Sequence, residues 1–259
     1  MKPSTKDTPA FRDAAHRRSS AGSFSTGASA YDLARPSYPV EVTALLAETG
    51  TPSPATVVDV GAGTGKLSSL LAAAGHRVLA CDPSADMVRA LRRNHPGIPA
   101  WRATAEQTAL ADATVDAYTA AQTWHWVDPT RASAEADRVV RPGGALLLCW
   151  NTLDVRHPWV LRLSRIMHSG DVQREGFYPD VRAPWRLRQE RRLTWIQGVS
   201  TFDLFDLMAT RSYWLRAGER TREKMTANLT WYLYERLGFG PGQLVPLPYR
   251  TDAFLYRRG

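Results

Sequence analysis

The sequence lacks several features that mark specialised classes of protein. It has only two cysteines among 259 residues, Cys81 and Cys149, so it carries no disulfide framework. No stretch approaches the ~18 consecutive apolar residues of a membrane-spanning helix. The N-terminus has no apolar segment of the kind that a secretory signal needs. Both cysteines lie in apolar stretches typical of buried strands, so we expect a cytoplasmic protein that has no membrane partner.

Lysine is also scarce, although the chain is basic. Only four of the 33 basic residues are lysine, and the formal net charge is +8. Residues 1–30 carry a net charge of +3, residues 31–150 carry −2, and residues 151–259 carry +7. A basic chain raises nucleic acid as a partner. Because the middle of the chain is slightly acidic, we expect no nucleic-acid partner, although a basic N-terminal arm stays an alternative.

Apolar β-branched segments alternate with amphipathic ones between residues 40 and 151. The segments ATVVDV, RVLACD, TVDAYTAA and ALLLCWN are typical of buried strands, and helical patterns of ~10–15 residues lie between them. This alternation predicts a parallel sheet with helices on both faces. Residues 1–29 are small and polar and predict a flexible leader. Residues 170–192 are expected to be irregular, LTWIQGVS to be a strand, and two helices to precede a last strand over 243–259.

The most informative cluster lies between the first strand and the next helix, in DVGAGTG from Asp59 to Gly65. Glycines there permit positive φ and let the backbone approach a ligand closely. The second strand ends at Asp82, at the distance where a carboxylate meets a ribose diol. The spacing is GxGxG rather than the dinucleotide pattern, and an acid precedes the first glycine. Asp59 suits a ligand with a cationic end, and S-adenosylmethionine, which has a sulfonium, an amino group and a ribose, matches both acids.

At these motifs the sequence resembles the class I S-adenosylmethionine-dependent methyltransferases. The resemblance extends over VVDVGAGTGKLS, ACDPSADMV, ATAEQTAL, TVDAYTAAQTWHWVD and RVVRPGGALLLCWN, and also over YDLARPSYP and YRTDAFLYRR. It is strongest for the small-molecule branch of trans-aconitate and juvenile-hormone-acid type methyltransferases. It implies a Rossmann-like α/β fold with a seven-stranded, mostly parallel sheet of order 3-2-1-4-5-7-6. It also implies a helical cap between the fifth and sixth strands.

The resemblance also implies an arrangement of domains and a set of residues that bind the cofactor. Residues 30–259 would form one domain, with 30–151 as the cofactor-binding half and 152–259 carrying the cap and the last two strands. Asp82 would hold the ribose, and Asp59 would orient the loop and the methionine amino group. The remaining cofactor contacts would be Tyr31, Arg35, Gly61, Ala62, Gly63, Pro83, Met87, Thr104, Ala105, Glu106 and Gln122.

Methyl transfer needs no metal and no nucleophilic residue, because the cofactor is already activated and the protein mainly aligns the reactants. The chain shows no His/Cys ligand spacing, so we expect no metal. His125 follows the fourth strand and is the candidate base or hydrogen-bond partner, although the same His-Trp pair occurs in relatives with different acceptors. Substrate candidates are Trp124, Trp126, Trp159, Tyr178, Trp185 and Arg186, with core packing as the alternative for Trp126 and a solvated face as the alternative for any single arginine.

The leading prediction is therefore an enzyme that methylates a small molecule, on oxygen rather than on nitrogen or carbon. An RNA methyltransferase is one alternative, but no separate RNA-binding module is visible and QTWH replaces an NPPY-type tetrapeptide after the fourth strand. A cofactor-binding protein of this fold that is not catalytic, or a cyclase, is another. The sequence says nothing of the acceptor's identity or of the oligomeric state.

Overall fold

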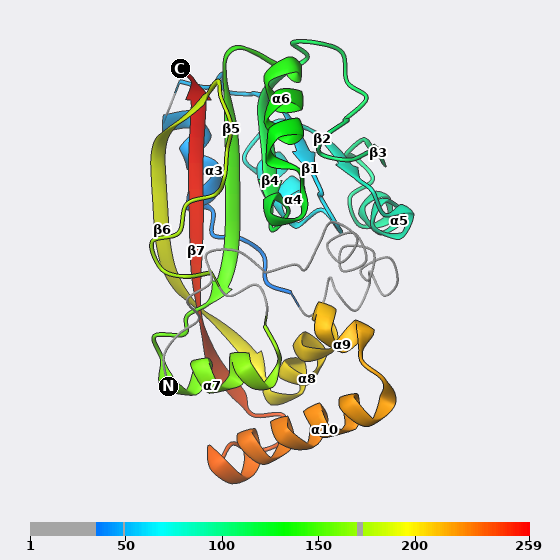
Figure 1. Ribbon diagram of the computed structural model, residues 1–259, viewed down its shortest axis with the longest axis vertical. Coiled ribbons are helices and arrows are strands. Elements are labelled where there is room, and N and C mark those ends of the chain that lie inside the picture. The colour runs from blue at the N-terminus through cyan, green and yellow to red at the C-terminus, as the bar shows by residue number, and fades with distance from the viewer. Residues whose placement is uncertain (1–34, 49, 170–172) are drawn as a thin grey trace. The chain divides into compact units, whose positions relative to one another are not determined.

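The computed structural model describes residues 35–48, 50–169 and 173–259, and these form two compact units (Figure 1). The sheet unit comprises residues 37–151, 179–193 and 251–259. The described residues of the helical unit are 35–36, 152–169 with 173–178, and 194–250. Each unit is therefore built from three separate segments of the chain.

A seven-stranded sheet has the order β3-β2-β1-β4-β5-β7-β6, which confirms the predicted topology. Its strands are β1 Thr56–Val60, β2 Arg77–Asp82, β3 Ala100–Arg102, β4 Val115–Ala121, β5 Val140–Leu153, β6 Trp185–Ser200 and β7 Leu244–Arg258. The pairs β1–β2, β1–β4, β2–β3 and β4–β5 are parallel. The carboxyl ends of β1, β2 and β4 therefore lie at one edge of the sheet, where open parallel sheets bind ligands.

The helices of the sheet unit are α3 Glu41–Glu48, α4 Lys66–Ala73, α5 Ala85–Asn94 and α6 Pro129–Val139, and the last two begin at a side-chain cap. Ser84 Oγ accepts a hydrogen bond from the Met87 amide at the start of α5, and Asp128 caps α6 by accepting from the Thr130 and Arg131 amides. Apolar residues of these helices and of the sheet form one core, which includes Val42, Leu71 and Leu147.

The helical unit has its own apolar core, to which Leu204, Leu229 and Leu233 contribute. Its helices are α7 Pro158–Ile166, α8 Thr201–Ala209, α9 Ser212–Arg216 and α10 Glu219–Thr230, and α10 continues as a π-helical turn, η3 Trp231–Arg236. One helix, α7, lies between β5 and β6, while α8, α9 and α10 lie between β6 and β7. The first of the two predicted helices is therefore interrupted at Thr210 and Arg211, and the second ends in a wider turn.

The first half of β6 differs from the expectation of irregular structure over 170–192. Residues from Trp185 onwards are extended, and most side chains up to Arg191 are exposed. An edge strand that is exposed on both faces has no apolar alternation, and arginines on such an edge discourage pairing with another chain. The strand is therefore not evident from a hydrophobic pattern. No helix among the described residues is long and apolar enough to cross a membrane.

Candidate cofactor and acceptor site

The glycine loop after β1 has the backbone conformation that the sequence predicted. Gly61 and Gly63 adopt φ of +60° and +57°, the left-handed region that favours glycine. A Cβ on Gly61 would lie 2.4 Å from the Thr123 side chain, whereas a Cβ on Gly63 would meet no atom of the described residues within 4 Å. Thr123 Oγ1 lies 3.1 Å from the Gly61 carbonyl oxygen. The loop after β1 thus packs directly on the loop after β4, and no described residue lies against the open side of Gly63.

Asp82 connects the end of β2 to the glycine loop. Its carboxylate accepts hydrogen bonds from the Gly63 amide (3.0 Å) and from the Ser84 amide (2.8 Å). Burial raises the pKa of Asp82, and the two backbone donors oppose this shift. An ionised carboxylate has about four acceptor sites, so two further donors fit on it. This geometry is compatible with the ribose hydroxyls that the resemblance assigns to Asp82.

Asp59 faces the interior of the sheet unit. Its carboxyl accepts from Ser68 Oγ on α4 (2.6 Å) and from Thr119 Oγ1 on β4 (3.0 Å). Burial is the main reason why the pKa of Asp59 is raised to about 7, and the nearby Asp82 raises it further. The described contacts hold β1 against α4 and β4, which fits the predicted role in orienting the loop. A contact with the methionine amino group stays a prediction.

Gln122 lies at the end of β4 in a strained conformation. Its φ is +53°, which is uncommon for a residue other than glycine. The side-chain amide donates to the Asn151 carbonyl, while Oε1 is buried and has no hydrogen-bond donor among the described residues. A buried acceptor of this kind is costly unless a donor reaches it. The amino group of S-adenosylmethionine is such a donor, so the orphaned oxygen fits the predicted cofactor.

Side chains from β4 and α6 fix the loop after β3, which carries Thr104, Ala105 and Glu106. Tyr118 donates its hydroxyl to the Ala105 carbonyl (2.6 Å), and Glu106 accepts from the Asp128 amide (2.9 Å). The Glu106 carboxylate therefore holds the start of α6. Two further predicted cofactor contacts follow Asp82 in the sequence. Of these, Met87 is buried, whereas Pro83 is exposed.

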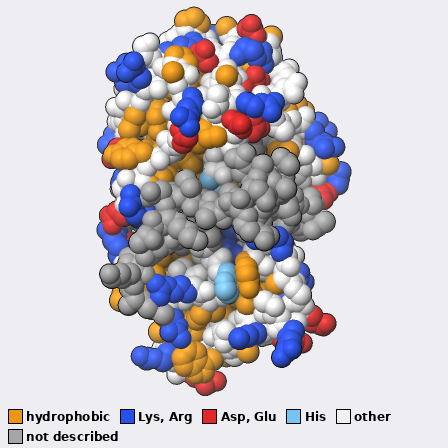
Figure 2. Space-filling view, in the orientation of Figure 1, with side chains coloured by type: hydrophobic (Ala, Val, Ile, Leu, Met, Phe, Trp, Pro, Cys, Tyr) orange, Lys and Arg blue, Asp and Glu red, His pale blue; other side chains and the backbone are white. Residues whose placement is uncertain are grey.

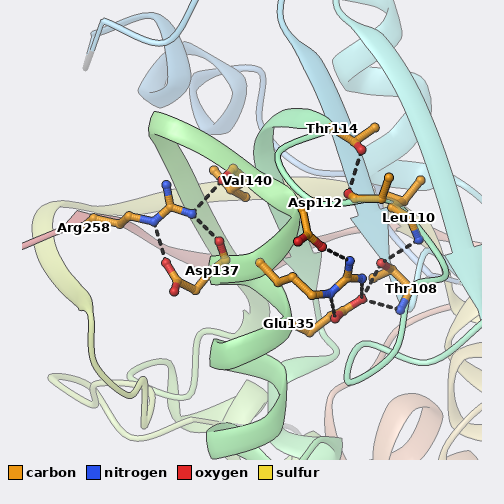
Figure 3. Close-up of polar contacts among 10 residues, drawn as sticks. Thr108, Leu110, Asp112, Thr114, Glu135, Asp137, Val140 and Arg258 are labelled. Atoms are coloured by element: carbon orange, nitrogen blue, oxygen red, sulfur yellow. Dashed lines mark hydrogen bonds and ion pairs between the residues drawn. The ribbon is translucent and has the colours of Figure 1, made fainter.

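Figure 3 shows a second anchor of the same loop, centred on Glu135 of α6. Glu135 Oε1 accepts from the Thr108 amide (2.7 Å) and hydroxyl (2.6 Å), and Arg138 joins Glu135 to Asp112. Burial acts to raise the pKa of Glu135, but the bonds from Arg138 and Thr108 outweigh it and lower the pKa. No sequence motif links Glu135 or Tyr118 to the loop that they hold, so neither residue was predicted.

The loop after β4 forms a short 3-10 turn, η2 Trp124–Trp126. Trp124 is buried, and its indole donates to the Asp180 carbonyl (2.8 Å). His125 Nδ1 accepts a hydrogen bond from the Trp150 indole (3.1 Å), and its ring lies 4.8 Å from that of Trp126. The structure therefore brings His125 to the sheet edge that carries the glycine loop, and it adds Trp150 as a partner that the sequence analysis missed.

Other predicted substrate residues of the sheet unit lie on β6. Trp185 is buried, donates to the Ser133 carbonyl (3.0 Å), and lies beneath the Arg258 guanidinium. Arg186 is exposed. Three neighbouring arginines are paired with carboxylates, namely Arg182 with Asp180, Arg191 with Glu48, and Arg192 with Asp252. Most of the local positive charge is thus matched within the unit.

The remaining predicted residues belong to the helical unit. Arg35 donates to the Thr210 hydroxyl (3.1 Å). Trp159 packs edge-on against Phe239, and its carbonyl accepts from the Tyr232 hydroxyl, while Tyr178 is exposed. Tyr31 and the predicted leader lie outside the described residues. Within the described ranges, no group of His, Cys, Asp and Glu side chains has the arrangement of a metal site.

Comparison with known proteins shows that the chain is a methyltransferase. Residues 58–148 match the family model described as "Methyltransferase domain". The "Uncharacterized methyltransferase Rv3342" of Mycobacterium tuberculosis is 38% identical over 236 residues, which cover 91% of this chain and 95% of the relative. A malonyl-[acyl-carrier protein] O-methyltransferase of Methylococcus capsulatus is 41% identical over 101 residues, or 37% of each chain. A solved structure described as a type II methyltransferase from Anaeromyxobacter dehalogenans has a TM-score of 0.61 at 24% identity, covering 85% of this chain and 97% of that one, and supports the fold.

Proposed function

Because the chain belongs to the class I S-adenosylmethionine-dependent methyltransferases, we propose that it transfers a methyl group to an oxygen of a small molecule. The acceptor oxygen belongs to a carboxylate or a hydroxyl group. S-Adenosylmethionine, when bound, supplies a methyl group on a sulfonium, so the chain's own residues need only to align the acceptor and exclude water.

The proposed cofactor site is built from the sheet unit. Asp82 accepts hydrogen bonds from the ribose, and the backbone of Gly61, Ala62 and Gly63 passes along the ligand. Gln122 Oε1, which has no donor among the described residues, accepts from the methionine amino group. The other contacts that we propose in this unit are those of Asp59, Pro83, Met87, Thr104, Ala105 and Glu106, and the contacts of Tyr31 and Arg35 stay predictions from the sequence.

The pairing of the arginines supports a small molecule rather than RNA as the acceptor. Arg182, Arg191 and Arg192 each form an ion pair with an acidic side chain of the sheet unit. On the described surface in Figure 2, Lys and Arg side chains are interspersed with Asp and Glu and form no continuous basic stripe. Recognition of RNA needs a basic surface that neutralises several phosphates, together with exposed aromatic side chains. This distribution of charge is the observation that carries the small-molecule proposal.

The test begins with binding and proceeds to transfer. Isothermal titration of the full chain with S-adenosylhomocysteine measures the cofactor site without any acceptor. Transfer of a radiolabelled methyl group from S-adenosylmethionine is then measured with three panels, of carboxylic acids, of phenols and alcohols, and of amines. We expect binding and label transfer to an oxygen acceptor. Transfer to bulk tRNA that persists at ~200 mM salt, with no transfer to any small molecule, would overturn the proposal.

A further inference from the structure

The sheet ends at β6, and the two halves of this strand differ in charge. The order of strands gives β6 a single neighbour, β7, so its other edge pairs with no strand among the described residues (Figure 1). The first half, from Trp185 to Arg192, carries four arginines and one glutamate, and charged side chains on an edge oppose pairing with another strand. The second half, LTWIQGVS from Leu193 to Ser200, has no charged residue and no proline. Charge therefore protects only half of this edge.

Exposed apolar side chains lie beside the uncharged half. Ile196 on β6 and Leu244 on β7 are 65% and 71% exposed, and Phe202, in the first turn of α8, is 57% exposed. A Cβ on Gly198 would lie 3.6 Å from the Leu244 side chain, and a Cβ on Gly242 would lie 3.0 Å from the Phe202 ring. These five residues all belong to the helical unit, and we call them the β6 patch.

The strand that carries the patch is held in place from its inner face. Val199 is buried in the core of the helical unit, and Trp195 packs against the same core. Successive side chains of a strand point to opposite faces, and Thr194, Ile196 and Gly198 are correspondingly exposed. The β6 patch is thus presented by a strand whose other face is fixed.

We propose that the β6 patch is an interface between two copies of the chain, in which the uncharged halves of two β6 strands pair antiparallel about a two-fold axis at Ile196. Two-fold dimers are the commonest assemblies of identical chains, and the interface in them is the same surface on both copies. An axis at Ile196 places the two isoleucines opposite each other and sets Thr194 opposite the partner's Gly198. Arg192, the nearest charged residue of the strand, then lies opposite the partner's Ser200, so no like charges meet.

The distribution of charge supports this register and a second copy as the occupant. An axis in the first half of β6 would oppose like charges, because an axis at Gln189 sets Arg186 opposite the partner's Arg192. With the axis in the second half, the arginine-rich half of each strand instead runs toward the end of the partner's strand, where α8 begins. The first two turns of α8 carry Asp203 and Asp206, and both are exposed. Basic and acidic segments of the same chain are therefore matched across one two-fold axis.

Sedimentation velocity of the full chain over a wide range of protein concentrations tests the association. We expect the average mass to rise from that of one chain toward that of two. Ile196→Lys should sediment as a monomer, because two lysines would face each other at the axis. The matched control is Leu187→Lys, at an exposed apolar position in the first half of the same strand, and it should associate like the wild type. Circular dichroism shows whether each variant is folded.

A cysteine at the axis tests the register and does not depend on the lysine variant. Cys81 and Cys149 are buried, so a new thiol on the surface is the one that an oxidant reaches. Residues directly opposite each other in an antiparallel pair have Cα atoms close enough for a disulfide. With dissolved oxygen as the oxidant, we expect Ile196→Cys to give a covalent dimer on non-reducing electrophoresis. Leu187→Cys should stay monomeric under the same conditions.

These outcomes decide the proposal. A wild-type chain that is monomeric at every concentration would overturn it. A dimer that persists in Ile196→Lys, or that gives no cross-link at position 196, would overturn it as well, because the copies would then meet at another surface or in another register. None of these measurements needs a cofactor or an acceptor, so their result is independent of the proposed function.

Discussion

The two units bury ionisable side chains of opposite character. Among the described residues of the sheet unit, the buried Asp, Glu, Lys and Arg side chains are all acidic, namely Asp59, Asp82, Glu135 and Asp252. Those of the helical unit are Arg211 and Arg250, together with Asp154, which pairs with Arg156. Burial of a charge is costly without a partner. The buried acids of the sheet unit suit the cationic cofactor that we propose for it.

Of the variants that test this comparison, Asp82→Asn is expected to have the largest effect, on the affinity for the cofactor. The new amide can present an N–H toward the Gly63 amide and accept fewer hydrogen bonds than the carboxylate does. We expect S-adenosylhomocysteine to bind about 100-fold more weakly, or ~3 kcal/mol. Titration calorimetry measures this, with the exposed Asp112→Asn as the matched control. Equal affinities in the two variants would remove Asp82 from the site.

The pH dependence of stability tests the free-energy cost of burying Asp59 in the sheet unit. Its pKa is raised by burial from the ordinary 3.8 to about 7 in the fold, so the folded chain binds more protons than the unfolded chain between these pH values. Stability should therefore fall as the pH rises through this window, by about 2 kcal/mol between pH 5 and 7. Asp59→Asn should lack this contribution. Urea unfolding of both proteins at the two pH values checks it, and identical pH dependence in wild type and variant would contradict it.

Arg211→Lys addresses the helical unit. Arg211 is buried, and lysine keeps the charge but lacks the planar set of donors that a guanidinium presents to its neighbours. We expect the free energy of unfolding to fall by about 1.5 kcal/mol. The control is Arg216→Lys, at an exposed position. Urea unfolding measures both, and equal stabilities of the two variants would show that the donors of Arg211 contribute nothing to the fold.

The smallest effect is expected for Arg186→Ala. Arg186 is exposed on β6, whereas Arg191 on the same strand is paired with Glu48 at 2.6 Å. If Arg186 contacts an anionic acceptor, its loss should raise KM by a few fold, and Arg191→Ala should leave KM unchanged. Steady-state kinetics with both variants measures the difference. Identical KM values in both would leave Arg186 a solvated side chain.

The glycine loop and Asp82 could be predicted because the residues that define this region lie close together in the sequence. The glycines at 61 and 63 permit a conformation that other residues rarely adopt, and Asp82 follows at the end of the next strand. The order of strands also follows from the motifs, and the structure confirms it. The branch within the methyltransferases stays a prediction, as do the individual ligand contacts.

Partners that are distant in the sequence could not be predicted in the same way. Nothing in the residues around His125 indicates that Trp150 donates to it, because the two meet only when β4 and β5 are adjacent. The same holds for Glu135, which reaches Thr108 across the sheet unit. The start of β6 could not be predicted for another reason. An exposed edge strand rich in arginine has no alternation of apolar and polar residues.

The segmentation of the two units has a consequence for how this chain is made and handled. Ala253 and Leu255 are fully buried in the same core as Val42, so the sheet unit needs residues that the ribosome adds after nearly all of the helical unit. Such long-range contacts slow folding, because a long loop must close before they form. No single cut in the chain releases either unit whole. The protein should therefore resist dissection into separately expressed halves.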